Sequence, residues 1–268
     1  MKVIRVCVFL LMIIFCINFT GCGKQNEEKD KIEIKRPDES FLKYGEDISN
    51  IVEMNKINNS VWVHTSYYDY NGSLSPSNGL VVVTNEGIVL VDTPWTDKQM
   101  ESLDKLVQEN FNCGIKDAVI THAHTDRIGG AAYLLGKNIK ITCLNRVAKR
   151  AKELGFTVPD DVIDADEYQF TVGDIDFELY YPGGGHTIDN TVLWIKKYNL
   201  LFAGCIVKEH GAISLGNTSE ADVVAWPDSL NNILTRYENI EVVVPGHGQW
   251  GDKSLIDYTL GLFTDENP

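Results

Sequence analysis

Residues 117–127 read DAVITHAHTDR, an apolar strand followed at once by two histidines and an aspartate. Neutral imidazole and carboxylate are ligands that zinc takes, and a catalytic zinc site keeps one position open for water or substrate. His122, His124 and Asp126 therefore predict a metal site at the end of a strand. Taken alone, the histidine pair has an ordinary alternative, in which two loop histidines are satisfied by hydrogen bonds.

Three further candidate ligands follow strand-like apolar segments later in the chain. They are His186 after a run of three glycines, Cys205 in the stretch FAGC, and His247 in the stretch PGHG. Taken singly, such a cysteine is usually a small buried residue and such a histidine belongs to a loop. Together with the first motif they make six candidate ligands, enough for two adjacent metal ions with three protein ligands each.

Hydrophobic periodicity predicts how helices and strands alternate along the chain. Apolar runs at 61–65, 80–83 and 88–91 indicate strands, the last two joined by a hairpin turn. Thr96 is placed to cap a helix that runs to about residue 110. The same plan continues with strands near 117–120, 139–143, 168–181, 191–201 and 241–244, and with helices near 130–135, 146–154, 221–233 and 254–263.

This order of elements predicts an α/β fold, an αβ/βα sandwich of two packed, mostly antiparallel sheets with external helices. The candidate ligands recur at strand ends, so we expect the site to lie along one edge of the sheets. No linker divides the chain after residue 40. Residues 41–268 are therefore expected to form one catalytic domain.

The amino terminus has the form of an export signal. Two basic residues precede an apolar run at 6–19, which is short for a membrane span and ends in the stretch FTGC at Cys22. That ending resembles a bacterial lipobox. We therefore expect residues 1–22 to be a lipoprotein-type signal with Cys22 lipidated, and 23–40 to be a polar tether. Ordinary signal cleavage and an uncleaved anchor are the alternatives.

The part that would be exported is strongly acidic. Removing the signal takes away Lys2 and Arg5, which leaves 22 of the 24 Lys and Arg against 38 Asp and Glu, a formal net charge of −16. This charge argues against nucleic acid as a partner. It does not argue against an anionic substrate, because bound zinc offsets it locally. We expect a monomer, lipid-anchored to the bacterial membrane, with a periplasmic or secreted soluble protein as the alternative.

Taken together, the motifs resemble those of the metallo-β-lactamases, from about Val61 to the carboxyl terminus. The matching stretches are HAHTDR at 122–127, GHTIDN at 185–190, GCIVK at 204–208, LGN at 215–217 and PGH at 245–247. Thioester hydrolases of the glyoxalase type share the superfold, but they have histidine directly after the aspartate of the motif, where this chain has Arg127. Cys205 is the ligand that the first, broad-spectrum dizinc subclass of these class B enzymes uses at its second metal.

The resemblance implies two zinc ions per chain. The first ion is implied to be bound by His122, His124 and His186. The second is implied to be bound by Asp126, Cys205 and His247. Three neutral imidazoles leave zinc enough Lewis acidity to lower the pKa of its bound water to about 7. The resulting hydroxide is implied to attack the lactam carbonyl, while the second zinc accepts the nitrogen that becomes anionic as the ring opens.

The resemblance also assigns catalytic roles beyond metal binding to Lys208 and Asn217, beside Asp126. Lys208 is implied to pair with the carboxylate of the antibiotic, and Asn217 to donate a hydrogen bond toward the lactam carbonyl. Without the surrounding motifs, Lys208 would be a solvated lysine and Asn217 part of an ordinary turn. Asp92 and Arg127 are expected to orient the ligands or the attacking water from behind, or to form a purely structural ion pair.

The stretch 67–78 contains glycine and proline and is expected to be a mobile hairpin loop. In the family that it resembles, the matching loop closes over substrate. We expect Tyr68, Tyr70 and Leu74, near its tip, to contact substrate, with Trp95 as a wall of the same cleft. The alternatives are loop aromatics that face solvent and a tryptophan that only packs in the core.

The sequence therefore predicts a zinc-dependent hydrolase that opens the β-lactam ring of penicillins, cephalosporins and carbapenems and confers antibiotic resistance. One alternative is a hydrolase of the same superfold that acts on a thioester or lactone, against which Cys205, Lys208 and Asn217 argue. The other is a non-catalytic zinc-binding lipoprotein at the cell surface, in which the same ligands leave no coordination position open.

Overall fold

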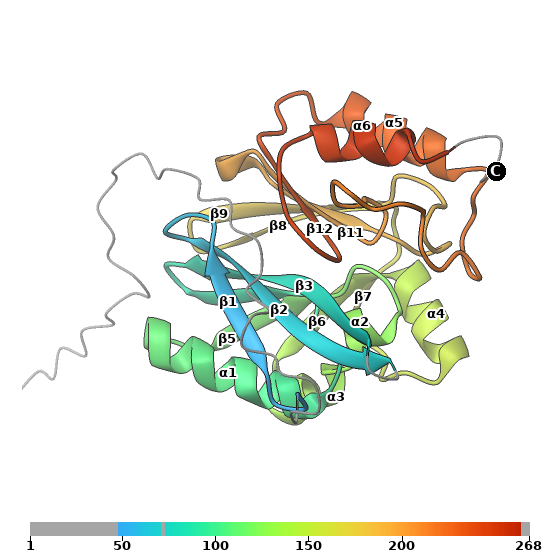
Figure 1. The fold of residues 1–268 in the computed structure, drawn as a ribbon. Helices are drawn as coiled ribbons and strands as arrows, with labels where there is room; N and C mark the ends of the chain where they lie inside the picture. The colour runs from blue at the N-terminus through green and yellow to red at the C-terminus, as the bar shows by residue number, and fades with distance from the viewer. Residues whose placement is uncertain (1–47, 71–72, 264–268) are drawn as a thin grey trace, which may run out of the picture.

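The computed structural model describes residues 48–70 and 73–263 of the 268-residue chain (Figure 1). The expected signal, the tether and Cys22 lie outside the described residues, as do the first seven positions of the expected catalytic domain. Within the described part, none of the helices has the length and apolar character that crossing a bilayer requires.

A seven-stranded sheet forms the lower layer of the view in Figure 1. The strands lie in chain order from one edge to the other, antiparallel from β1 to β4 and parallel from β4 to β7. Their bounds are β1 (Val52–Lys56), β2 (Val61–Tyr70), β3 (Ser73–Thr84), β4 (Gly87–Val91), β5 (Ile115–Val119), β6 (Lys140–Leu144) and β7 (Asp161–Ile163).

A five-stranded sheet lies above it, in the order β12-β11-β10-β9-β8. Strands β8 to β11 pair antiparallel, and β12 joins β11 in parallel. The bounds are β8 (Glu167–Val172), β9 (Ile175–Tyr180), β10 (Val192–Ile195), β11 (Leu200–Gly204) and β12 (Val242–Pro245). The predicted sandwich of two sheets is thus confirmed, and antiparallel pairs outnumber parallel ones as expected. Most of the candidate ligands follow the parallel pairs in the chain, so these pairs position the candidate site.

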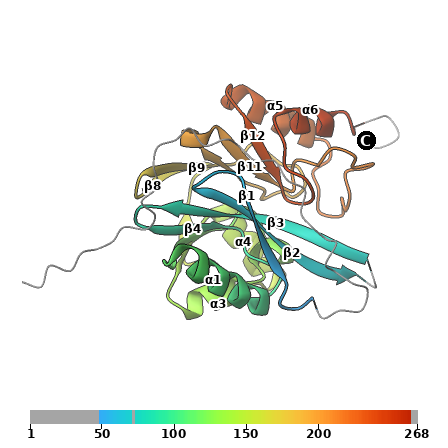
Figure 2. The same cartoon turned by 60° about the vertical axis from the view of Figure 1, so that its left-hand side comes forward.

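Helices cover the outer face of each sheet (Figures 1 and 2). Those on the first sheet are α1 (Asp97–Phe111), α3 (Ala131–Gly136) and α4 (Asn145–Leu154), and those on the second are α5 (Trp226–Arg236) and α6 (Ser254–Leu260). Thr96 caps α1 as predicted, since its side chain accepts a hydrogen bond from the Gln99 N–H. A parallel neighbour can be reached only by a crossover, which explains why helices separate the parallel strands.

Three apolar clusters hold these layers together. The first fills the space between the two sheets, where Val63 and Leu193 are fully buried. The second joins the first sheet to its helices through residues such as Leu103, and the third joins the second sheet to α5 and α6 around Trp226. Burying one such large side chain stabilises the fold by about 1.5–3 kcal/mol, so each layer is anchored by several of them.

Two local predictions differ from the structure. The helix expected over 221–233 begins only at Trp226, where proline stands in the first turn, and Val224 ahead of it is 90% exposed. The stretch 67–78 is regular hairpin rather than loop, because β2 continues to Tyr70 and β3 starts at Ser73, with Tyr68 opposite Ser75. Pro76 pairs with Tyr67 and therefore does not interrupt the ladder.

Candidate active site

The fold brings the six candidate ligands together at the carboxyl ends of parallel strands. His122 follows β5, and Cys205 and His247 follow the parallel pair β11 and β12. Asp126 lies in the single-turn helix α2 (Thr125–Ile128), and His186 follows β9. Because parallel strands end at the same edge of a sheet, side chains far apart in the sequence converge there.

His122, His124 and His186 form the first cluster. Their ligand atoms all lie within 4.8 Å of one another, and the His186 Nε2 is 3.1 Å from the His124 Nδ1. Burial lowers the pKa of His122 and of His186 well below the ordinary value, so both imidazoles are neutral at pH 7. A neutral ring nitrogen has the free lone pair that metal ligation requires.

Asp126, Cys205 and His247 form the second cluster, again with ligand atoms within 4.8 Å of one another. The His247 Nε2 lies 3.4 Å from the Cys205 Sγ and 3.3 Å from the Asp126 Oδ2. Burial disfavours the charged imidazole of His247, but Cys205 and Asp126 outweigh it and raise the pKa to about 10. The cluster thus attracts positive charge, which either a proton on His247 or a metal ion can supply.

Both clusters fit zinc by their chemistry, and the first cluster also has an unpartnered ligand atom. The Nε2 of His122 is buried without a hydrogen-bond partner among the described residues. Its other ring nitrogen lies 3.2 Å from the Thr121 hydroxyl, which in turn donates to the Asp92 Oδ2 at 2.8 Å. The hydroxyl therefore accepts the Nδ1–H of His122, and Nε2 keeps its lone pair for a metal. Imidazole, carboxylate and thiol are the donors that zinc takes.

Arg127 and Asp92 lie directly behind the ligands. Arg127 is fully buried, and its Nη2 donates to the Asp126 Oδ2 at 2.6 Å and to the Gly246 carbonyl at 2.7 Å. Its Nη1 donates to the Asn78 carbonyl and lies 3.5 Å from the Asp92 Oδ2. Although burial alone would raise it, Arg127 holds the pKa of Asp126 well below its usual range. The guanidinium thus keeps this carboxylate ionised.

Two carboxylates around the first cluster were missed by the sequence analysis. The Glu220 Oε2 lies 3.6 Å from the His124 Nε2 and 2.6 Å from the Arg150 Nη2. The Asp189 Oδ2 accepts the backbone N–H of Ala123 at 2.9 Å and so fixes the turn between the two histidines. Asp189 belongs to the GHTIDN stretch, which was a usable signal, whereas nothing in the sequence connects Glu220 with His124.

A cleft of about 720 Å³ opens over both clusters. Trp95, Lys208 and Asn217 line it, and Tyr68 packs on Trp95 with ring centroids 5.2 Å apart. On the hairpin, Ser75 is the lining residue rather than the half-buried Leu74. Tyr70 ends β2, and its side chain lies outside the described part. The structure therefore gathers Trp95, Lys208 and Asn217 at the cleft, and brings Tyr68 there through Trp95.

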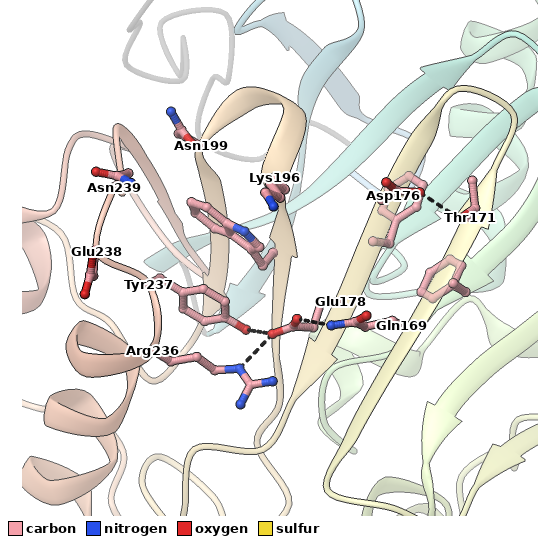
Figure 3. A pocket seen from close by; sticks show the side chains of 13 residues that line it. Gln169, Thr171, Asp176, Glu178, Lys196, Asn199, Arg236, Tyr237, Glu238 and Asn239 are labelled. Carbon is pink, nitrogen blue, oxygen red and sulfur yellow. Dashed lines mark hydrogen bonds and ion pairs between the residues drawn. The ribbon is translucent and has the colours of Figure 1, made fainter.

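A second hollow, of about 770 Å³, lies on the outer face of the second sheet (Figure 3). Glu178 is at its centre and accepts hydrogen bonds from Gln169, Arg236 and Tyr237 at 2.6–2.8 Å. Trp194 stacks on Tyr237 behind this network, with ring centroids 4.9 Å apart. These polar side chains form their hydrogen bonds with one another, and the network stabilises the part of the sheet that no helix covers. The hollow is explained by this network.

A two-sheet α/β sandwich with adjacent three-ligand zinc sites defines a class of metal-dependent hydrolases, and known proteins place the chain within it. The sequence model of the Metallo-beta-lactamase superfamily matches residues 72–247, and the chain belongs to that family. The type 2 metallo-beta-lactamase of Bacillus sp. (strain 170) is 38% identical over 254 residues, which cover 94% of this chain and 97% of the relative.

Further relatives agree in sequence and in structure. The type 2 metallo-beta-lactamase of Bacteroides fragilis is 35% identical over 213 residues, covering 79% of this chain and 85% of that protein. The solved metallo-beta-lactamase from Pontibacter korlensis superposes with a TM-score of 0.77 at 40% identity, covering 79% of this chain and 98% of that one. The chain is accordingly a zinc-dependent hydrolase of β-lactams, with ligand sets for two zinc ions.

Proposed function

We propose that the chain opens the β-lactam ring of penicillins, cephalosporins and carbapenems and thereby confers antibiotic resistance. The observation that carries this proposal is the cleft, whose lining includes Lys208 and Asn217 together with ligands of both three-ligand clusters. When bound, two zinc ions supply Lewis acidity that activates water at neutral pH and stabilises negative charge on the leaving nitrogen. His122, His124 and His186 would hold one ion, and Asp126, Cys205 and His247 the other.

Lys208 is proposed to bind the carboxylate of the antibiotic. Its side chain is half-buried at the cleft wall, where a charge-assisted hydrogen bond is stronger than in open water. Binding at this point would hold the lactam ring across the two clusters. Because this charge pair forms in the bound substrate and persists in the transition state, its loss should raise KM more than it lowers kcat.

Asn217 is proposed to donate its side-chain N–H to the lactam carbonyl oxygen. Its carbonyl Oδ1 accepts the backbone N–H of Ser219 at 3.1 Å, which leaves the amide nitrogen as the group able to reach a substrate. A donor placed where the oxygen becomes anionic lowers the barrier more than it tightens substrate binding. We expect Asn217→Ala to lower kcat by about 10-fold to 1000-fold.

The hairpin of β2 and β3 and the indole of Trp95 are proposed to contact substrate over the cleft. Tyr68 is 40% exposed and packs on Trp95, so the two rings form an apolar surface beside the ligands. Tyr70 and Leu74 are closer to the tip and are proposed to follow the same surface when substrate binds. Closing such a hairpin would exclude water from the reacting atoms.

The amino-terminal segment is proposed to place the enzyme at the cell surface. Residues 1–22 would be processed as a lipoprotein-type signal by cleavage before Cys22, Cys22 would carry lipid as the new amino terminus, and 23–40 would tether a catalytic domain over 41–268 that acts as a monomer. Fractionation of cells that express Cys22→Ala tests the anchor. We expect the variant to leave the membrane fraction, and a variant still firmly bound there would contradict the proposal.

Hydrolysis by purified residues 23–268 tests the activity. We expect turnover of a penicillin, a cephalosporin and a carbapenem that a chelator abolishes and that Cys205→Ala weakens. If protein shown to contain zinc hydrolyses a thioester or a lactone but no lactam, another hydrolase of the superfold is the correct assignment. Zinc bound tightly without any turnover would instead assign metal capture.

A further inference from the structure

Trp226, the first residue of α5, lies beneath two parts of the site at once. Its indole is fully buried, and its Nε1–H donates to the Ile206 carbonyl at 2.8 Å, which fixes the plane of the ring. The Lys208 Nζ lies 5.4 Å from the ring centroid. The ring of His186 approaches at 5.9 Å and 64°, in an edge-on geometry. One rigid side chain therefore contacts the substrate-side lysine and a metal ligand.

The ammonium of Lys208 lacks a carboxylate partner of its own. Across residues 48–70 and 73–263, no ion pair involves this group, and burial lowers its pKa. The negative groups near enough to raise the pKa are Cys205 and Asp126, both of which bound zinc would neutralise. A half-buried cation in these surroundings needs another source of negative potential.

The face of an indole supplies that potential. Its π system carries a negative quadrupole above the ring, and a cation within about 6 Å of the centroid is attracted to it, more strongly for tryptophan than for the other aromatic residues. Because Trp226 is fully buried, water competes little for this attraction. Gly216 adds no side chain beside the ammonium, since a Cβ at this position would lie 3.8 Å from the Lys208 Nζ.

We propose that Trp226 is a positioning residue that holds the Lys208 ammonium at the cleft wall through a cation–π contact, ready for the carboxylate of an anionic substrate. A protein carboxylate could also hold the lysine, but the substrate would then have to displace it. An aromatic face attracts the cation without occupying its hydrogen-bond donors. The inference rests on the role proposed above for Lys208.

Fluorinated tryptophans, introduced at position 226 alone, test this contact. Each added fluorine withdraws negative potential from the ring face while the shape and the Nε1–H donor are kept. We expect KM for benzylpenicillin to rise stepwise through the mono-, di- and trifluoro variants, to about 3-fold to 30-fold in total, with kcat little changed. The methyl ester of the same penicillin lacks the carboxylate, so its KM should stay flat across the series.

Two controls separate this role from packing. The same fluorinated residues at Trp194, which stacks on Tyr237 beside the second hollow, should leave KM unchanged. Zinc content and the melting temperature should also be unchanged at position 226, because the ring still packs on His186. The ring current of Trp226 should shift the Lys208 Hε resonances of ¹³C-lysine-labelled protein upfield, and Trp226→Leu should abolish that shift.

The outcomes distinguish this inference from the proposed function. If the unmodified enzyme hydrolyses penicillin but KM is flat across the series, or rises equally for the ester, Trp226 does not act through Lys208. The same conclusion follows if the Lys208 resonances show no ring-current shift. If the unmodified, zinc-loaded enzyme turns over no lactam, the proposed function itself has failed, and the ring-current measurement alone still decides whether the contact exists.

Discussion

Replacing Arg127 by methionine should destabilise the metal-free protein far more than the zinc-loaded one. Arg127 is fully buried and donates to Asp126 and to the carbonyls of Gly246 and Asn78, with Asp92 close by. Methionine fills a similar volume but supplies neither charge nor donors. Without zinc, the buried Asp126 carboxylate then keeps only the imidazole of His247, 3.3 Å away, as a cationic partner. With zinc, the metal balances this charge in place of the guanidinium.

The magnitude follows from the groups left behind. Breaking one buried ion pair costs about 3–5 kcal/mol, and a buried carbonyl that loses its donor costs about 1–3 kcal/mol more. Burial already raises the pKa of Asp92 to about 7, so this carboxyl can take up a proton and adds little. A loss of about 4 kcal/mol or more is large against a total stability of about 5–15 kcal/mol. In a domain of this size it lowers the melting temperature by roughly 8–16 °C.

Thermal unfolding with a chelator and with saturating zinc measures the effect. We expect zinc to restore at least half of the drop in melting temperature that the metal-free Arg127→Met protein shows. Arg127→Lys is the matched control, since it keeps the charge but loses the forked geometry. Its melting temperature should lie between those of the parent and of Arg127→Met. A metal-free Arg127→Met protein that melts within about 3 °C of its parent, or an equal drop with and without zinc, would refute the reasoning.

Three further predictions concern single contacts. Burial lowers the pKa of His64 from 6.5 to about 4. The stability that the neutral imidazole contributes above pH 6.5 is therefore lost as the pH falls to 4, by about 3 kcal/mol. Urea titrations of His64→Gln should show a smaller loss of stability over the same pH range. Glu220→Gln removes the charge beside His124 and should weaken zinc binding at the first cluster about 10- to 100-fold, measured by competition with a chromophoric chelator. Gly246→Ala places a methyl group 2.5 Å from the Cys205 Sγ. Metal analysis should then find one zinc per chain, and two would contradict the expected clash.

The six ligands could be predicted from the sequence because each is marked by a local pattern. His122 and His247 come directly after apolar strands, and Cys205 follows a strand that ends in glycine. Strand ends of a layered α/β fold converge, so the pattern already carries part of the geometry. The antiparallel start of the first sheet was also predictable, because a short turn can join only antiparallel neighbours, as it does between β3 and β4.

What could not be predicted depends on long-range packing. Glu220 contacts His124 only because Arg150, on α4, holds its carboxylate from the other side, and no spacing in the sequence links these residues. Pro76 suggests a loop, yet its carbonyl accepts the Nδ1–H of His247 at 2.6 Å within a continuous strand. The strand persists there because the hairpin and the second metal cluster support each other.

The distribution of ligands between the two sheets makes metal binding a tertiary cross-link. The first cluster takes His122 and His124 from the first half of the fold and His186 from the second, and the second cluster joins Asp126 to residues that follow β11 and β12. Arg127 spans the same gap, from the hairpin of β3 to the turn after β12. The guanidinium of Arg127 thus joins the two sheets at this edge, and two bound zinc ions would join them further. At the opposite edge, the apolar core and a hydrogen bond from the Asn85 N–H to the Asp174 carboxylate join the sheets without a metal, so removal of zinc should loosen the structure first at the active site.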